Sequence, residues 1–325
     1  MHIITRRATL GGIGLLTATA ARAQTEVFPS RPVRLVVPFP PGGSTDVVGR
    51  IVAQGLQEAL GQPIVVENRA GQAGILGSNF VRTTPADGYT LLMTNIGSQG
   101  IGPFVYRAVP YDTMRDFTHV GLMGTFYNVL VVNPRFSAQT LAVFIAEAKR
   151  RPGAINFATS SNGSSNHLLG ELLKLEAGID IVHVPYRGAG PALTATIGGE
   201  VPAMFDSVPS ATSHVQAGTL RALAVSAPRR VAALPDVPTF TELGLPRLVA
   251  DNWFGLSAPA GTPAAIVSRL SQALNAALAT PAVASKLREI GFDIVPMDPP
   301  AFTAFVANQL GFWEDIVKRA GVTAN

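Results

Sequence analysis

The sequence predicts an α/β protein with two lobes that are joined by two extended segments. Strand-like runs alternate with helix-like runs along most of the chain, which is typical of parallel β–α–β units. A second set of such units is flanked by extended stretches near 120–132 and 251–258, which we interpret as two crossovers between the lobes. The 325 residues are enough for two domains of ordinary size. Two α/β lobes that share two crossovers form a hinge with a cleft between them.

The elements of the first lobe follow from hydrophobic spacing and from turn residues. Apolar residues recur at helical spacing from Val47 to Leu60, and Gly61 ends this helix. The Asp87-Gly88 pair marks a turn before a strand. The predicted order is strand 33–37, helix 47–60, strand 63–66, helix 75–82 and strand 89–94.

The second set of units begins after extended stretches at 117–123 and 128–133. Its predicted order is helix 141–150, strand 155–159, helix 168–178, strand 181–184, a helix to about 197, strand 202–206, helix 208–217 and strand 220–225. An extended stretch at 251–257 and helices at 263–279, 281–290 and 299–320 complete the chain. The lobes are therefore expected to comprise 24–124 with 252–325, and 125–251.

The composition fits a folded protein rich in buried sheet. Hydrophobic residues make up 47% of the chain and charged residues 14%, which argues against disorder. The net charge of +4 includes Arg6, Arg7 and Arg22 in a predicted leader, and without them it is about +1. No basic cluster with interleaved aromatic residues is present, so we expect no nucleic-acid partner. Cysteine is absent, which excludes disulfides, thiolate metal sites and cysteine catalysis.

Residues 1–23 have the pattern of an export signal peptide. A short basic region with Arg6 and Arg7 precedes an apolar stretch that ends at Ala21-Arg22-Ala23, an A-x-A cleavage signal. The stretch is too short and too rich in Gly and Thr to span a bilayer, which takes about 20 apolar residues. We expect cleavage near Ala23 and, in a cell with an outer membrane, a periplasmic protein. An uncleaved amphipathic helix is the alternative, and the paired arginines leave the Sec and twin-arginine routes open.

The segment from Pro38 to Asp46 is predicted to be the centre of a binding site. Three prolines end the first strand, because proline can neither donate a hydrogen bond nor continue a strand. Two glycines then let a ligand approach the main chain, and the free N–H groups at the following helix start favour an anion. Without a lysine, the loop is not a Walker-type P-loop. The predicted donors are Gly42, Gly43, Ser44 and Thr45; the alternative is an ordinary strand–helix turn in which Ser44 or Thr45 is the cap.

Three further polar loops follow strands of the predicted sheets. Because open α/β sheets bind ligands at the carboxyl ends of their strands, we expect these loops to share one edge with the first. The predicted ligand-binding residues in them are Gly71, Gln72, Ala73, Gly74, Ser98, Ser161, Asn162, Gly163 and Ser164. For the last four of these, a polar helix cap is the alternative.

Two titratable residues are candidates beside these loops. Asp206 ends a buried strand at the same edge; it would repel a carboxylate but suits an ammonium group or a bridging water, and a helix cap is the alternative. His167 is a weaker candidate, because a lone histidine inside a helix is more often structural. Phe126 and Tyr127, on the first crossover, are candidates for the cleft wall. Tyr186-Arg187 is expected to shape the second lobe rather than touch solute.

Several motifs in order resemble those of the tripartite tricarboxylate transporter substrate-binding proteins, also called Bug-type solute receptors. The resemblance covers nearly all of the mature chain. The matching stretches are Val37-Pro38-Phe39-Pro40-Pro41-Gly42-Gly43-Ser44-Thr45-Asp46, Val66-Glu67-Asn68-Arg69, Asp87-Gly88-Tyr89-Thr90-Leu91, Val184-Pro185-Tyr186-Arg187-Gly188, Gly218-Thr219-Leu220-Arg221-Ala222-Leu223-Ala224-Val225 and Val237-Pro238-Thr239-Phe240.

The resemblance implies a two-lobed, periplasmic-binding-protein-like (type II) fold that closes on a small carboxylate. It implies that backbone N–H groups and waters of the first-lobe loops hold the carboxylate, and that Asp206 matches an acid lining the cleft in relatives. One departure concerns the second loop, where the family has Gly-Ala-Gly-Gly and this chain has Gly71-Gln72-Ala73-Gly74. Alanine disfavours the positive φ that glycine permits, so we expect this loop to present its N–H groups differently or to bind a different group.

The predicted function is an exported receptor that captures a small carboxylate and delivers it to a membrane transporter. A sensor that reports to a signalling protein shares the same site and is left open, as is the identity of the carboxylate. A serine hydrolase with Ser44 or Ser161 as nucleophile and His167 as base has little support, because no G-x-S-x-G elbow is present. No H-x-x-x-H pair or dense acidic loop suggests a metal. We expect no cofactor and a monomer.

Overall fold

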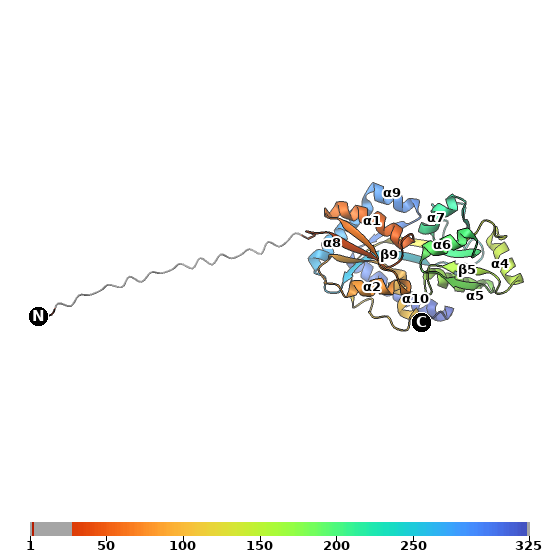
Figure 1. The fold of residues 1–325 in the computed structure, drawn as a ribbon, viewed down its shortest axis with the longest axis horizontal. Helices are drawn as coiled ribbons and strands as arrows, with labels where there is room; N and C mark the ends of the chain where they lie inside the picture. The colour runs from red at the N-terminus through yellow and green to blue at the C-terminus, as the bar shows by residue number, and fades with distance from the viewer. Residues whose placement is uncertain (1, 3–27, 324–325) are drawn as a thin grey trace.

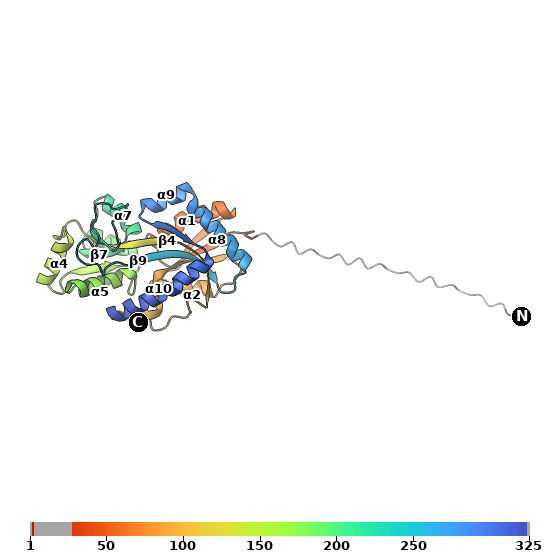
Figure 2. The same ribbon diagram turned by 180° about the vertical axis from the view of Figure 1, so that it is seen from behind.

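Two long antiparallel strands, β4 (Phe117–Val132) and β9 (Asp251–Pro259), run through both lobes of the molecule and join them. The computed structural model describes residue 2 and residues 28–323. The predicted leader 1–23 therefore lies outside the described residues, apart from His2. In the described part, strands follow the order β2-β1-β3-β9-β4-β7-β5-β6 in one mixed sheet, with β8 and β10 also paired to β4. Figures 1 and 2 show β9 and β4 passing between two helix-covered lobes.

Lobe 1 is the lobe that contains the parallel strands β2-β1-β3, to which β9 adds an antiparallel neighbour. Its strands are β1 (Val33–Val37), β2 (Ile64–Asn68), β3 (Thr90–Asn95) and β10 (Asp293–Met297). Its helices are α1 (Ser44–Leu60), α2 (Ile75–Arg82), α3 (Gly102–Val105), α8 (Ala264–Ala279), α9 (Pro281–Glu289) and α10 (Pro299–Ala320), with short turns η1 (Gln72–Gly74) and η2 (Gly97–Ile101).

Lobe 2 is the lobe that contains the parallel strands β7-β5-β6. Its strands are β5 (Asn156–Thr159), β6 (Val182–Pro185), β7 (Ala203–Ser207) and β8 (Arg221–Val225). Its helices are α4 (Leu141–Arg150), α5 (Ser165–Ala177), α6 (Ala189–Gly198) and α7 (Val208–Gln216). Both β7 and β8 pair with the far end of β4, so this lobe is anchored on the same strand as lobe 1.

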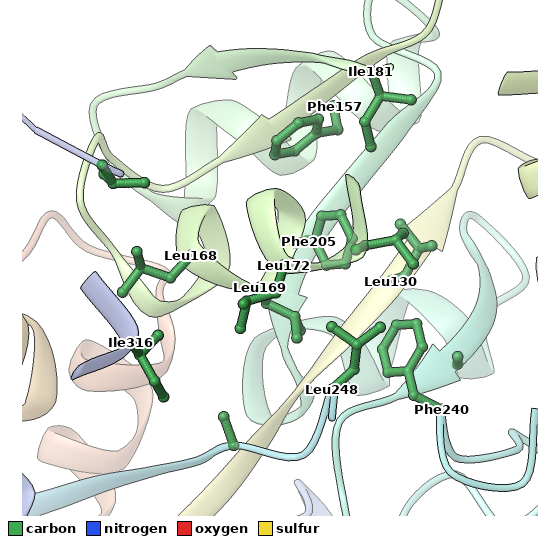
Figure 3. Close-up of a cluster of buried hydrophobic side chains, with 14 of the residues drawn as sticks. Leu130, Phe157, Leu168, Leu169, Leu172, Ile181, Phe205, Phe240, Leu248 and Ile316 are labelled. Atoms are coloured by element: carbon green, nitrogen blue, oxygen red, sulfur yellow. The ribbon is translucent and has the colours of Figure 1, made fainter. Parts of the chain in front are cut away.

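The hydrophobic cores hold the helices against the sheet. In lobe 1, α1 packs closely on α8: a Cβ at Gly55 would lie 2.8 Å from the Cβ of Ala277, so only glycine fits at this crossing. In lobe 2, Phe157 and Phe205 pack edge to face, 5.5 Å apart, with leucines of α5 around them (Figure 3). Ile316 of α10 belongs to the same cluster, so the C-terminal helix bridges the two lobes.

The structure confirms the predicted two-lobed α/β fold with two crossovers, and it corrects some element bounds. Residues 117–132 form one continuous strand, which joins the predicted extended stretches at 117–123 and 128–133. β10 was not predicted, because it is exposed and pairs only with β4 through a bulged register. Helix α1 begins at Ser44 rather than 47, and Gly43 rather than Ser44 or Thr45 is its N-cap, because the polar Ser-Thr-Asp turn is already helical. α5 likewise begins at Ser165 rather than 168.

Candidate functional site

A cavity, here called the first cavity, lies between the lobes where the loops after β1, β3, β5 and β7 meet. Of the predicted loops, those after β1, β3 and β5 meet here with the end of β7, whereas the loop after β2 does not line this cavity. The cavity has a volume of about 60 Å³, which is room enough for a small polar group. The residues that line it are Phe39, Pro40, Gly43, Ser44, Thr45, Asn95, Ile96, Gly97, Phe126, Asn128, Ser160, Ser164, Ser165, Asn166, Ala189, Asp206, Ser207, Asn252 and Phe254.

The loop after β1 is fixed by Asp46. This buried carboxylate accepts hydrogen bonds from the Gly42 N–H over 3.1 Å, from Arg50 Nε over 3.0 Å and from Asn68 Nδ2 over 2.9 Å. Burial alone raises the pKa of Asp46, but these hydrogen bonds outweigh it and hold the pKa below its usual 3.8. The Gly42 N–H is therefore already used, whereas Gly43, Ser44 and Thr45 line the first cavity at the positive end of α1.

Four asparagines line the first cavity, Asn95, Asn128, Asn166 and Asn252, and none of them was predicted as a ligand-binding residue. Asn166 Nδ2 donates to Asn128 Oδ1 over 3.1 Å, which leaves Asn128 Nδ2 without a partner among the described residues. Asn252 Nδ2 also has no partner there. Asn128 and Asn252 are each 1% exposed, and a buried donor without an acceptor costs about 1–3 kcal/mol. Both donors are therefore expected to be satisfied by whatever fills the cavity.

A signal for two of these residues was present in the sequence. Asn128 and Asn252 each interrupt an apolar run on a crossover, and asparagine is depleted in strands. The side of the sheet on which these two side chains lie, however, depends on the pairing of β4 with β9, which places Asn252 opposite Phe126. Phe126 and Phe254 form an apolar wall of the first cavity, with ring centroids 4.6 Å apart. Tyr127, the other predicted wall residue, does not line it.

Asp206 lines the first cavity from the end of β7 and is 2% exposed. Burial raises the pKa of Asp206 to about 6, and hydrogen bonds from the Ser210 hydroxyl and the Ser207 backbone limit the rise. No lysine, arginine or histidine is among the described residues that line this cavity. The site therefore offers neutral donors, a helix start and one weak acid.

A second cavity of about 450 Å³ adjoins the first and shares Phe39, Pro40 and Ser160 with it. Among the residues predicted from the sequence, Gly71, Gln72, Ala73, Gly74, Ser161 and Asn162 line this second cavity rather than the first. Its other lining residues are Ala70, Tyr106, Tyr186, Arg187 and Gly188. The predicted site residues are thus divided between two adjacent spaces.

The loop 71–74 keeps a glycine-type conformation despite its sequence. Gln72 and Ala73 have φ of 47° and 50°, both in the left-handed region. This backbone costs about 1–2 kcal/mol for a residue with a Cβ, yet the chain adopts it between Gly71 and Gly74. Ala73 thus takes the positive φ that alanine disfavours, and a different presentation of the N–H groups of this loop stays a prediction.

Four predicted residues line neither cavity, and one of them is Gly42, whose N–H donates to Asp46. Ser98 is fully buried, and its N–H donates to Asn95 Oδ1 while its carbonyl accepts from the Tyr111 hydroxyl. The Gly163 N–H donates to Nδ1 of His167 over 3.1 Å, and the His167 ring stacks on His183 with centroids 3.7 Å apart. As ligand contacts, these residues stay predictions. Ser164 caps α5, which was the alternative reading, and it also lines the first cavity; as a ligand contact it stays a prediction.

The described residues contain no group of three or more His, Asp or Glu side chains placed to hold a metal ion. Within the same residues, no helix is both long and apolar enough to cross a bilayer.

Comparisons with known proteins agree on a family. The family model for the tripartite tricarboxylate transporter family receptor matches residues 48–322. Protein BugT of Bordetella pertussis is 39% identical over 316 residues, which cover 96% of this chain and 97% of BugT. The structure of R. palustris Rpa4515 with adipate is 36% identical, with a TM-score of 0.88 over 91% of this chain and 99% of that one. The periplasmic binding protein BugD is 31% identical, with a TM-score of 0.88 over 92% of this chain and 100% of BugD.

Proposed function

The chain belongs to the tripartite tricarboxylate transporter receptor family, and from this premise we propose that it is a periplasmic receptor that captures a small carboxylate and delivers it to a membrane transporter. The ligand would sit in the first cavity with a carboxylate at the start of α1. Export would follow from the predicted leader, and the receptor would act as a monomer without a cofactor.

The single observation that carries this proposal is the pair of buried, unpartnered amide donors, Asn128 Nδ2 and Asn252 Nδ2. They lie on β4 and β9, the strands that join the lobes, and both line the first cavity. Buried donors are almost always paired in native proteins. A carboxylate supplies two acceptor oxygens with about four lone-pair sites, which matches two amide donors and the N–H groups of α1.

The absence of a cation among the lining residues of the first cavity supports a site built from neutral donors. Such donors cost less to desolvate than an arginine fork, so the empty receptor stays stable while the ligand charge is shared over several dipoles. Asp206 would then face a hydroxyl or ammonium group or a bridging water of the ligand. The adipate bound to Rpa4515 supports the carboxylate class.

We propose that the lobes follow the predicted bounds 24–124 with 252–325, and 125–251, and that they close on the ligand. A ligand shifts an open–closed equilibrium only by its differential affinity for the closed form. Lobe 1 would supply Gly43, Ser44 and Thr45 for the first contact. Groups of lobe 2 such as Asp206 and Asn166 would supply the additional affinity of the closed form for the ligand. Small-angle scattering profiles that are identical with and without saturating ligand would contradict closure.

The test of the proposed function is calorimetry on the mature protein against mono-, di- and tricarboxylates. We expect at least one of them to bind with a Kd in the micromolar range or below, which corresponds to about −8 kcal/mol. Matched amides of the same acids, which lack the charge, serve as controls and are expected not to bind. No heat with any acid at millimolar concentration would overturn the proposal.

Two alternatives make different predictions. A sensor shares this site and differs only in its partner, so a pull-down with the liganded and ligand-free protein against transporter subunits separates the two.

The hydrolase alternative needs a base near the nucleophile. Among the described residues, no histidine lines the cavity that holds Ser44, and His167 Nδ1 already accepts from Gly163. Ser44→Ala tests this alternative. The hydrolase would have to cleave an ester as wild type and lose that activity in the variant.

A further inference from the structure

Three side chains at the end of β7 and the start of α7 form a short chain of hydrogen bonds beside the first cavity. The Ser210 hydroxyl donates to Asp206 Oδ2 over 2.5 Å, and the hydroxyl oxygens of Ser210 and Ser207 are 2.9 Å apart. All three residues are at most 6% exposed. Asp206 and Ser207 line the first cavity, whereas Ser210 does not. Ser210 therefore connects the carboxyl group to the Ser207 hydroxyl from outside the cavity lining.

The side chain of Ser207 lies on the same face of the sheet as that of Asn128. The two residues are direct partners in the antiparallel pairing of β4 with β7, and the side chains of such partners are neighbours on one face. Asn128 lines the first cavity, and its Nδ2 has no partner among the described residues. The Ser207 hydroxyl is therefore placed beside a donor that we assign to the ligand.

Each of these hydroxyls has a single proton, so the charge of Asp206 sets the direction of the whole chain of hydrogen bonds. An ionised carboxylate only accepts, and a hydrogen bond to it is stronger than one to a neutral oxygen, so the Ser210 proton goes to Asp206. The Ser210 oxygen then accepts from Ser207, and Ser207 turns only lone pairs toward the cavity. When the carboxyl group is neutral with its proton on Oδ2, it donates to Ser210. Ser210 then donates to Ser207, and the Ser207 proton is free for the ligand.

Asp206 is the one titratable side chain among the described residues that line this cavity. Burial raises its pKa to about 6, so the neutral and the ionised form exchange between pH 5.5 and pH 7.5. The elements packed against β7 are β4, β5, α5, α6 and α7. The other titratable or charged side chains that these elements carry, none of which lines this cavity, are His119, Tyr127, His167, Glu171, Lys174, Glu176 and His214.

We propose that Ser210 and Ser207 form a hydroxyl relay, through which Ser207 offers the ligand an acceptor while Asp206 is ionised and a donor once Asp206 is neutral. This inference rests on the proposed function. It makes Ser207 a ligand contact and Ser210 a positioning residue that acts through Ser207. A carboxylate ligand gains the hydrogen bond from Ser207 only when Asp206 is neutral, and this gain comes in addition to the loss of repulsion from Asp206.

The test is calorimetry at pH 5.5 and pH 7.5 with three acids that carry no hydroxyl or ammonium group, namely acetate, adipate and tricarballylate. At pH 5.5, Ser207→Ala should bind at least about tenfold more weakly than wild type, the usual effect of one charge-assisted hydrogen bond. At pH 7.5 it should bind within about twofold of wild type, because Ser207 has no donor to lose. An equal loss at both pH values, or no loss at either, overturns the relay.

A double-mutant cycle tests whether Ser210 carries the signal. In a Ser210→Ala background the Ser207 hydroxyl no longer responds to Asp206, so adding Ser207→Ala should cost the same factor at pH 5.5 and at pH 7.5. A cost that still depends on pH in this background overturns the relay. Ser210→Thr keeps the hydroxyl and should keep the wild-type difference between the two pH values, and thermal unfolding shows whether each variant is folded.

The matched control is Ser213→Ala, which removes an exposed hydroxyl of the same helix and lines neither cavity. It should bind as wild type does at both pH values. A wild type that binds hydroxy or amino acids but none of the three plain acids at pH 5.5 overturns the inference while the receptor function stands. If the wild type binds no acid of any kind, the proposed function fails and the inference falls with it.

Discussion

Asn166 Nδ2 donates to Asn128 Oδ1 over 3.1 Å, and this contact joins helix α5 of lobe 2 to the crossover strand β4 inside the first cavity. It fixes the orientation of the Asn128 amide, because Oδ1 accepts from Asn166 and Nδ2 is left free. A side chain from one lobe thereby orients a donor on the strand that joins both. The binding donor is thus positioned before any ligand arrives.

Asn128→Asp tests this donor with almost no change in shape. The aspartate still accepts from Asn166 but replaces a free donor with a charged acceptor facing the ligand. We expect carboxylate affinity to fall by about tenfold to a hundredfold, since a charge-assisted hydrogen bond is exchanged for repulsion. Calorimetry measures the affinity, and thermal unfolding shows whether the fold is intact. Asn275→Asp, on an exposed face of α8, is the matched control and should bind as wild type does.

The raised pKa of Asp206 predicts a pH dependence of binding. Burial raises this pKa to about 6, so the carboxyl is mostly neutral at pH 5.5 and ionised at pH 7.5. A ligand that has carboxylates but no ammonium group should therefore bind more weakly as the pH rises through 6, by roughly tenfold over this interval. Asp206→Asn should flatten the dependence and bind such a ligand at pH 7.5 as well as wild type does at pH 5.5.

Protonation of the ligand itself changes its binding to wild type and to Asp206→Asn by the same factor at each pH. The ratio of wild-type to Asp206→Asn affinity is therefore the quantity to follow. A ratio that rises with pH would mean that the ionised Asp206 faces a cation, and would point to an amino acid instead of a plain carboxylate.

Asp46 predicts a pH dependence of stability with the opposite sign. Hydrogen bonds from Arg50, Asn68 and the Gly42 N–H outweigh burial and lower its pKa. Because its pKa is lower in the folded state, the contribution of Asp46 to stability is fully present above the unfolded-state pKa of 3.8. This contribution is lost as the pH falls through the folded-state pKa. We expect Asp46→Asn to lower the free energy of unfolding at pH 7 by about 2 kcal/mol. Denaturant titrations should show this deficit shrinking below pH 3.8.

Asp236→Asn is the control for Asp46, because Asp236 is exposed and lies in no ion pair of the described residues. It should leave stability within about 0.5 kcal/mol of wild type. A deficit in Asp46→Asn that is equal at pH 7 and pH 3 would show that the loss is one of packing rather than of charge.

The part of the site that could be predicted from sequence is the part built by local rules. Three prolines and two glycines after the strand that ends at Val37 have few backbone solutions, so the loop and the start of α1 were expected nearly where they lie. Parallel strands then bring their carboxyl ends together by geometry alone. The same local rules assign Ser164 as a cap of α5.

The remaining residues depend on distant pairings that no local pattern encodes. Asn128 and Asn252 face the same cavity only because β4 and β9 pair with each other, with two register shifts along their length. Gly163 and His167 have the composition of a polar site, but in the folded chain the N–H of one is used by the ring of the other. Arg187 was expected to shape its lobe, and its place in the second cavity depends on hydrogen bonds to the neighbouring strand end.

Gly188→Ala tests closure at the contact between the lobes. Gly188 has φ of 124°, and a Cβ there would lie 2.7 Å from Cγ of Pro40, across the cleft in the loop after β1. Because the lobes must separate to relieve this contact, we expect a larger radius of gyration by small-angle scattering and at least about tenfold weaker ligand binding.

The control is Gly218→Ala, which also has positive φ but no atom within 4 Å of the added Cβ. It should lose stability from backbone strain of about 1–2 kcal/mol and keep its shape and affinity. Equal radii for Gly188→Ala and wild type, each with saturating ligand, would show that the two lobes accommodate the methyl group without opening.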